Sequence, residues 1–253
     1  TGMPFSASVM IACPWYLEAV EILRDQPQVS VGIHLTLNSE WQHYKWGPVL
    51  GSSRVPTLVN ENGHFHTTAD DFAAANVDLA EVEMELRAQI ERARSAGLRI
   101  DYLDYHMLTA VSTPELTAIV EGLAEEYGYG LARYFREPSV SLWDTPPENK
   151  LGSLLDVLDR LESGRPTLLV MHLGLNGPEM AALIDVNNPT DSDRVGMHRG
   201  AELEALLSSE FRQAIADRGI RLVNYRDIIE EYGLDAMQRR TGPGYSMDVG
   251  EQP

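Results

Sequence analysis

Short apolar runs alternate with amphipathic helical patterns along most of this chain, and this alternation limits the fold more than any other feature. Such an order builds parallel βαβ units, because each helix returns the chain to the start of the next strand. We therefore expect an α/β fold with a parallel sheet, open or closed into a barrel, in a single domain of residues 1–253. Ligands of such folds gather at the carboxyl ends of the strands.

The apolar runs and helical periodicities place the individual elements. Predicted strands cover residues 8–12, 29–37, 100–103, 131–135, 167–171 and 221–224. Predicted helices cover residues 15–24, 79–96, 114–127, 151–161 and 202–218. Between the second strand and the second helix, residues 39–76 form a long polar and aromatic insertion with two prolines, which we place near the mouth of the site.

Charge and cysteine content exclude several classes of function. The chain has 20 Lys and Arg against 38 Asp and Glu, a formal net charge of −18. Nucleic acids and anionic membranes need a basic face, so we expect neither as a partner. Cys13 is the only cysteine, and it follows an apolar run, so a buried structural thiol is favoured over a catalytic one.

The sequence also carries expectations about location and assembly. No apolar run approaches the roughly 18 residues of a membrane span, and no signal-peptide pattern is present, so we expect a cytoplasmic protein. The partner we expect is a small molecule, and a homodimer stays open.

Three of the seven histidines follow the apolar cores of predicted strands. His34 lies in VGIHLTL, His106 closes IDYLDYH, and His172 closes TLLVMH. Strand ends meet at one edge of a parallel sheet, so the three imidazoles indicate a metal or acid–base site there. Hydrogen-bonded core histidines are the alternative. Two imidazoles and a carboxylate leave room for the water that a hydrolytic metal requires.

Five segments in this order resemble the YdjC/ChbG-type (ChbG/HpnK-like) carbohydrate deacetylases, related to the polysaccharide deacetylases. The matching segments are SASVMIACPWYLEAVEIL, VGIHLTL, LRIDYLDYHM, LLVMHLG and RGAELEALLSSEFRQAIADRGIRLVNYRDI. The resemblance covers nearly the whole chain. It implies a distorted (β/α) barrel and a metal-dependent amidohydrolase that acts on acetylated amino sugars such as chitooligosaccharides, with a small carbohydrate as substrate.

The resemblance also implies roles for particular residues. His34 and His106 match the two histidines that bind the metal, one divalent ion, with zinc or magnesium foremost and manganese, cobalt or nickel still open. His172 matches the histidine that acts as general acid or stabilises the transition state. Arg133 and Arg136 resemble an arginine-bearing strand that lines the site and binds substrate.

Asp104 stands two residues before His106 and so points to the same side of its strand. We expect it to act in catalysis by orienting an imidazole, with a buried structural acid as the alternative. Trp41 and Trp46 lie in the insertion among polar residues. They form either a stacking platform for sugars, hence substrate-binding residues, or a hydrophobic cluster of the loop.

The pattern departs from the family at several points. The family's Asp-Asp pair belongs to a first strand that precedes the stretch beginning at Thr1, so we expect this strand upstream, and metal binding depends on it. Asp70-Asp71-Phe72 resembles the pair but precedes a helix, where acidic residues favour the helix start. Leu173 replaces the proline that follows the histidine equivalent to His172.

Three hypotheses of function remain from the sequence. The leading one is a metal-dependent deacetylase of N-acetylated amino sugars. The absent acidic pair motivates a second, a carbohydrate-binding relative with impaired catalysis. The third is another metal-dependent hydrolase on the same scaffold, such as a phosphoesterase, although such sites usually need several carboxylates.

Overall fold

A computed structural model describes residues 2–188 and 191–240 of the chain, which divide into two compact units. The larger unit contains Pro4–Glu40, Lys45–Phe135 and the described residues from Val223 onward. The smaller unit contains Trp41–Tyr44 and Arg136–Leu222, apart from residues 189–190, together with residues 2–3. The single domain expected from the sequence stays a prediction.

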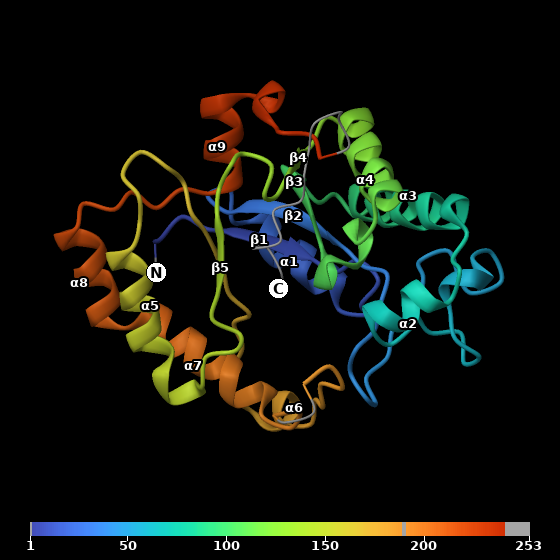
Figure 1. Ribbon diagram of the computed structural model, residues 1–253, viewed down its shortest axis with the longest axis horizontal. Coiled ribbons are helices and arrows are strands. Elements are labelled where there is room, and N and C mark those ends of the chain that lie inside the picture. The colour runs from blue at the N-terminus through green and yellow to red at the C-terminus, as the bar shows by residue number, and fades with distance from the viewer. Residues whose placement is uncertain (1, 189–190, 241–253) are drawn as a thin grey trace. The chain divides into compact units, whose positions relative to one another are not determined.

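A parallel four-stranded sheet in the order β1-β2-β3-β4 forms the centre of the larger unit (Figure 1). Its strands are β1 (Ser6–Val9), β2 (Ser30–Leu35), β3 (Tyr102–Tyr105) and β4 (Gly130–Leu131). The register pairs Gly32 with Tyr102 and His34 with Asp104. Gly32 is required by packing, because a Cβ atom there would meet the Tyr102 ring at 2.5 Å.

Most helices of the larger unit begin at a side chain that caps them, whereas the helix that begins at Tyr16 has no side-chain cap. Thr113 accepts the amide of Leu116 at the start of one helix, and Asp78 accepts the amide of Ala80 at another. The long helix at 79–95 buries Val82, as its periodicity predicts. The helices are α1 (Tyr16–Arg24), α2 (Ala69–Ala74), α3 (Leu79–Ser95), α4 (Pro114–Tyr127) and α9 (Tyr225–Tyr232), with short 3-10 turns at Pro56–Leu58, His106–Val111 and Leu234–Ala236.

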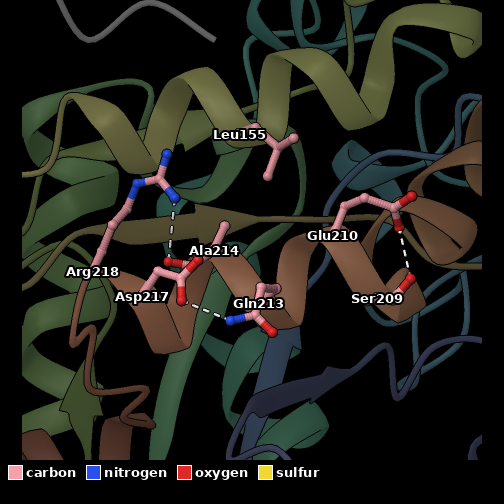
Figure 2. Close-up of a pocket in the computed structure, with 7 residues that line it drawn as sticks. All are labelled: Leu155, Ser209, Glu210, Gln213, Ala214, Asp217 and Arg218. Atoms are coloured by element: carbon pink, nitrogen blue, oxygen red, sulfur yellow. Dashed lines mark hydrogen bonds between the residues drawn. The ribbon is translucent and has the colours of Figure 1, made fainter.

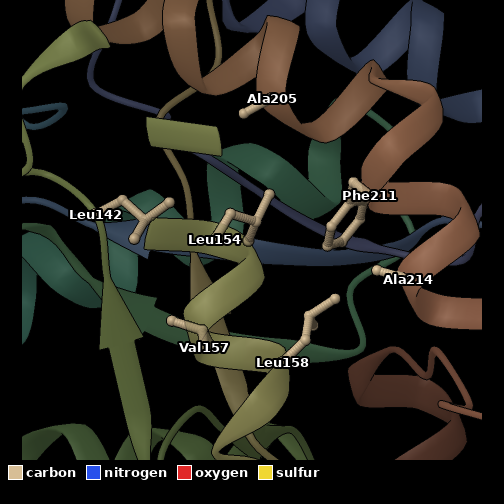
Figure 3. Close-up of a cluster of buried hydrophobic side chains, with 7 residues drawn as sticks. All are labelled: Leu142, Leu154, Val157, Leu158, Ala205, Phe211 and Ala214. Carbon is tan, nitrogen blue, oxygen red and sulfur yellow. The ribbon is translucent and has the colours of Figure 1, made fainter. Parts of the chain in front are cut away.

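The smaller unit combines a strand pair with helices. Its elements are the parallel pair β5 (Ser139–Ser141) and β6 (Leu168–Val170), a 3-10 turn at Pro147–Asn149, and the helices α5 (Lys150–Asp159), α6 (Pro178–Ala181), α7 (Val195–Leu207) and α8 (Ser209–Asp217). The core of this unit lies where α5 meets α7 and α8, around Leu154 and Phe211, which are both almost fully buried (Figure 3).

The α/β class with parallel strands is confirmed, whereas the barrel is not. In the described ranges 2–188 and 191–240, the named strands form an open four-stranded sheet and a separate pair, with no closed sheet. Several predicted elements are wrong in whole or in part. Of the strand expected at 131–135, only Leu131 lies in β4. Residues 221–224 form no strand, because Asn224 instead caps α9 by accepting the amide of Asp227. The helix expected at 202–218 is two helices, because Ser208 has extended backbone angles and caps α8.

An ion pair between Arg226 and Asp101 connects helix α9 to the sheet of the larger unit. Arg226 donates from Nη2 to Asp101 Oδ2 at 2.7 Å and from Nε to Oδ1 at 3.0 Å. Asp101 also accepts the amide of Val31 in β2 at 2.8 Å. Burial is the largest single influence and would raise the pKa of the Asp101 carboxyl, but the bonds and charge of Arg226, together with hydrogen bonds from the Val31 amide and from Ser30, outweigh it and hold that pKa below its ordinary value.

None of the helices in the described residues combines the length and the apolar character that crossing a bilayer requires.

Candidate functional site

His34 and Asp104 occupy paired positions on the adjacent strands β2 and β3. His34 Nδ1 and Asp104 Oδ1 are 2.6 Å apart, and the other carboxylate oxygen accepts the hydroxyl of Ser8 from β1 at 2.8 Å. The side chains of His34 and Asp104 are 23% and 18% exposed, so a ligand can reach this part of the strands. Asp104 therefore contacts the imidazole of His34, and a catalytic role for it stays a prediction.

His106 follows β3 directly and faces His34. Its Nδ1 lies 3.3 Å from His34 Nε2, and the two rings meet edge to face with centroids 5.3 Å apart. On its other side, His106 Nε2 lies 2.7 Å from Glu40 Oε2, and the Glu40 side chain is only 6% exposed. Each imidazole thus has a carboxylate on its outer nitrogen and the other imidazole opposite its inner nitrogen.

The carboxylates favour one tautomer of each ring. A carboxylate accepts hydrogen bonds, so neutral His34 donates from Nδ1 to Asp104 and neutral His106 donates from Nε2 to Glu40. The lone pairs of His34 Nε2 and His106 Nδ1 then face each other across 3.3 Å, and either a proton on one of these nitrogens or a metal ion between them removes the repulsion. Two nitrogens bound to one tetrahedral zinc ion at about 2.0–2.1 Å lie about 3.3 Å apart. The donor pair therefore fits a shared divalent metal ion.

Within the described ranges, His34 and His106 have no third metal-binding side chain beside them. Among the residues that the structure describes, no group of three or more His, Cys, Asp or Glu side chains could hold a metal ion. Glu40 and Asp104 are engaged on the outer nitrogens. The described part of the chain thus supplies two imidazole nitrogens that face each other and two carboxylates that contact the outer nitrogens.

The backbone after His106 adopts a conformation that side chains rarely tolerate. Met107 and Leu108 are consecutive non-glycine residues with φ of +50° and +58°. Asn38 holds this turn, because its carbonyl Oδ1 accepts the Thr109 hydroxyl at 2.9 Å and its amide lies 3.1 Å from Met107 Sδ. Strain of this kind, about 1–3 kcal/mol per residue, persists where the surroundings impose it and often marks functional sites.

The tryptophans predicted to bind sugar are buried. Trp46 is 4% exposed, donates its indole N–H to the Asn38 carbonyl at 2.9 Å, and contacts the His106 ring edge to face at 6.0 Å. Trp41, in the smaller unit, is 7% exposed with Arg199 over its ring. Both tryptophans therefore pack against their surroundings, as the alternative of a hydrophobic cluster in the loop predicts. Substrate binding by either of them stays a prediction.

The predicted arginines share an unusual backbone geometry. Arg133 has φ of +68° and Arg136 has φ of +61°. In the larger unit, the Arg133 amide donates to the Tyr225 hydroxyl at 3.2 Å, and its carbonyl accepts Arg240 Nη2 at 2.9 Å. In the smaller unit, the Arg136 carbonyl accepts Arg165 Nε at 3.2 Å. Both turns are held by side chains, and a substrate role for either arginine stays a prediction.

His172, the predicted general acid, follows β6 in the smaller unit. Its ring contacts Trp143 edge to face with centroids 5.3 Å apart. Its backbone amide donates to Glu202 Oε2 at 2.7 Å. The Trp143 ring also contacts His198, whose Nε2 lies 2.5 Å from Asp191 Oδ2.

Other chemistry-bearing residues prove to be structural. Burial, together with repulsion by the Glu40 carboxylate, raises the pKa of the Cys13 thiol to about 12, so it stays protonated and inert. Asp71 forms the expected helix start, because it exchanges hydrogen bonds with Thr68 in a capping box at α2. A surface groove on α5 and α8 is lined by residues such as Glu210 and Arg218 and contains none of the candidate site residues (Figure 2).

Three contributors to the site were missed from the sequence. Glu40 lies in the irregular insertion, where no periodicity fixes its direction. Ser8 and Asn38 are common residue types that acquire their roles only through neighbouring strands. The one available signal was position, since Glu40 lies six residues after His34 and close to the end of the same strand.

Comparison with known proteins places these features in a family. A family model described as YdjC-like protein matches residues 1–217. A carbohydrate deacetylase of Geobacillus stearothermophilus is 30% identical over 237 residues, which cover 89% of this chain and 87% of that relative. A carbohydrate deacetylase of Enterococcus faecalis is 28% identical over 244 residues and covers 90% of this chain and 88% of its own.

A solved structure shows a similar fold. It is the crystal structure of a protein from Enterococcus faecalis described as a proposed cellobiose-phosphate cleavage protein. It superposes with a TM-score of 0.69 at 27% sequence identity, and the match covers 88% of this chain and 87% of the other.

Proposed function

This chain belongs to the YdjC-like protein family, and from that premise we propose that it is a metal-dependent hydrolase that removes acetyl groups from N-acetylated amino sugars or oligosaccharides. Similarity to relatives named carbohydrate deacetylase supports a carbohydrate deacetylase function. The finer parts of the proposal are the divalent metal ion and a substrate of chitooligosaccharide type.

One observation carries the metal part of the proposal: the inner nitrogens of His34 and His106 face each other at 3.3 Å while Asp104 and Glu40 hold the outer ones. Pairing of a metal-binding histidine with a carboxylate fixes its tautomer and makes the inner nitrogen a better ligand. Imidazole donors favour zinc over magnesium, so zinc is the metal we expect first.

The residues of this chain divide the work of amide hydrolysis. When bound, a divalent metal ion polarises the acetamide carbonyl and lowers the pKa of the attacking water. Asp104 and Glu40 keep the outer protons on His34 Nδ1 and His106 Nε2. His172 donates a proton to the departing amine, so that water and the acetamide become acetate and a free amino sugar. Arg133 and Arg136 are proposed to bind the hydroxyl groups of the sugar.

The test measures acetate release from N-acetylglucosamine and from short chitooligosaccharides, with zinc supplied after treatment with a chelator. We expect wild-type protein to release acetate and His34→Ala and His106→Ala to lose at least about 100-fold in kcat/KM, because each loses a metal ligand. Bound zinc, measured by elemental analysis, should fall in the same variants.

His64→Ala is the matched control, because His64 is a half-buried loop imidazole outside the site. It should keep both zinc and activity. Zinc-loaded wild type that releases no acetate from any of these sugars would overturn the proposed activity. Full zinc binding by the double variant His34→Ala/His106→Ala would overturn the proposed metal ligands.

A further inference from the structure

A buried ion pair in the smaller unit bonds to the backbone of both His172 and Trp143. Lys150 Nζ and Glu202 Oε1 are 3.0 Å apart, and each side chain is only 1% exposed. Lys150 is the first residue of α5, and Glu202 lies in α7. Desolvation makes such a pair costly, so it is weak evidence of a stabilising role, and its other bonds decide what it does.

Those other bonds lead to the two rings at the end of β6. The second Glu202 oxygen, Oε2, accepts the backbone amide of His172 at 2.7 Å. Lys150 Nζ donates to the backbone carbonyls of Leu142 at 2.5 Å and Trp143 at 3.3 Å. One ion pair therefore connects the backbone that carries the Trp143 indole to the backbone that carries the His172 imidazole.

The rings of the two residues are also in contact. The Trp143 and His172 rings are edge to face at a centroid distance of 5.3 Å, with an interplanar angle of 72°. The segment after β6, residues 171–177, has no regular secondary structure, so no ladder of hydrogen bonds fixes His172. Instead, Glu202 binds the backbone amide of His172, and Lys150 binds the backbone carbonyl of Trp143.

We propose that Lys150 and Glu202 are positioning residues that hold His172 against Trp143 and thereby set the direction in which its imidazole donates a proton. This inference rests on the proposed function for its catalytic consequence, but the ring contact itself does not depend on it. A proton donor displaced by about 1 Å can cost about 100-fold in rate.

Glu202→Gln tests the proposal, because it removes the charge while keeping the shape of the side chain. The amide group of glutamine meets two donors, the Lys150 ammonium and the His172 amide, and can accept only through its one oxygen. We expect kcat on chitooligosaccharides to fall about tenfold or more with little change in KM, because a positioning role affects the transition state.

A second measurement follows the ring contact without any substrate. Protonated imidazole quenches indole fluorescence at short range, so the emission of the wild type should fall on acidification. The share of this quenching that disappears in His172→Asn reports the contact between the two rings. Trp143→Phe identifies the indole concerned. Since His198 also contacts Trp143, only the part that depends on His172 counts. We expect Glu202→Gln to lose this part.

Glu204→Gln is the matched control, because Glu204 is an exposed glutamate of the same helix. It should change neither kcat nor quenching. If Glu202→Gln unfolds, the double variant Lys150→Met/Glu202→Gln removes both buried charges and leaves an oxygen for the His172 amide, and it is judged by the same two readouts.

A folded variant that keeps wild-type quenching and kcat would overturn the positioning role. Loss of quenching in a protein whose wild type releases no acetate would overturn only the proposed activity and support the positioning role. Wild-type quenching that does not respond to His172→Asn would overturn the ring contact on which the inference depends.

Discussion

At the scale of single residues, the site consists of two histidines, each held by a carboxylate. His34 pairs with Asp104 at 2.6 Å and His106 with Glu40 at 2.7 Å. These carboxylates do not face the shared space between the rings. Their effect on a metal ion therefore passes through the imidazoles, by fixing tautomer and ring direction.

Asp104→Asn and Glu40→Gln should weaken zinc binding by about 10–100-fold without removing it, because the amides hold the imidazoles less firmly and no longer favour one tautomer. Isothermal titration of metal-free protein with zinc measures the change. Glu115→Gln, an exposed carboxylate at the start of α4, is the control. Zinc affinity unchanged in both site variants would contradict the orienting role.

Residue patterns predicted part of this site and not the rest. His34, His106 and Asp104 follow from strand ends and the two-residue period of a strand. Glu40 does not, because an irregular loop has no period from which its direction follows. Lys150 and Glu202 do not follow either, because they are 52 residues apart in the sequence and their buried ion pair exists only in the folded structure.

At the scale of elements, capping explains where the predictions of structure fail. The side chains of Ser208 and Asn224 each cap the first turn of the helix that follows them. Periodicity alone predicts one helix through Ser208, although serine is a favoured N-cap residue and therefore a signal for a new helix start. Where periodicity is strong and the cap is clear, the observed helices at 79–95 and 114–127 agree closely with the predicted helices at 79–96 and 114–127.

The attachment of α9 through Asp101 and Arg226 gives a prediction about stability and pH. Asp101→Asn should lower the free energy of unfolding by about 2–3 kcal/mol at neutral pH, because it weakens charged hydrogen bonds to a half-buried guanidinium. The lowered pKa of Asp101 means that its contribution is present above about pH 4 and is lost as the pH falls through the folded pKa.

Urea unfolding of wild type and Asp101→Asn at about pH 7 and about pH 3 measures this effect. The difference between the two proteins should be largest at the higher pH and shrink at the lower one. An equal difference at both pH values would show that the Asp101 charge does not contribute through Arg226.

At the scale of the whole molecule, the alternation of strands and helices correctly gave the α/β class and the parallel sheet. Closure into a barrel could not follow from it, because the same alternation serves open and closed sheets. The order of the five segments that resemble the family indicated membership in it, and the match over residues 1–217 shows that membership. The net charge of −18 constrains partners and does not define the fold.

The central claim is that His34 and His106 share one divalent metal ion, and X-ray absorption spectroscopy of the zinc-loaded protein tests it most directly. We expect one zinc ion per chain with two imidazole nitrogens at about 2.0–2.1 Å, reduced to one in His34→Ala and in His106→Ala. A zinc ion whose imidazole signal is unchanged in both variants would contradict the account.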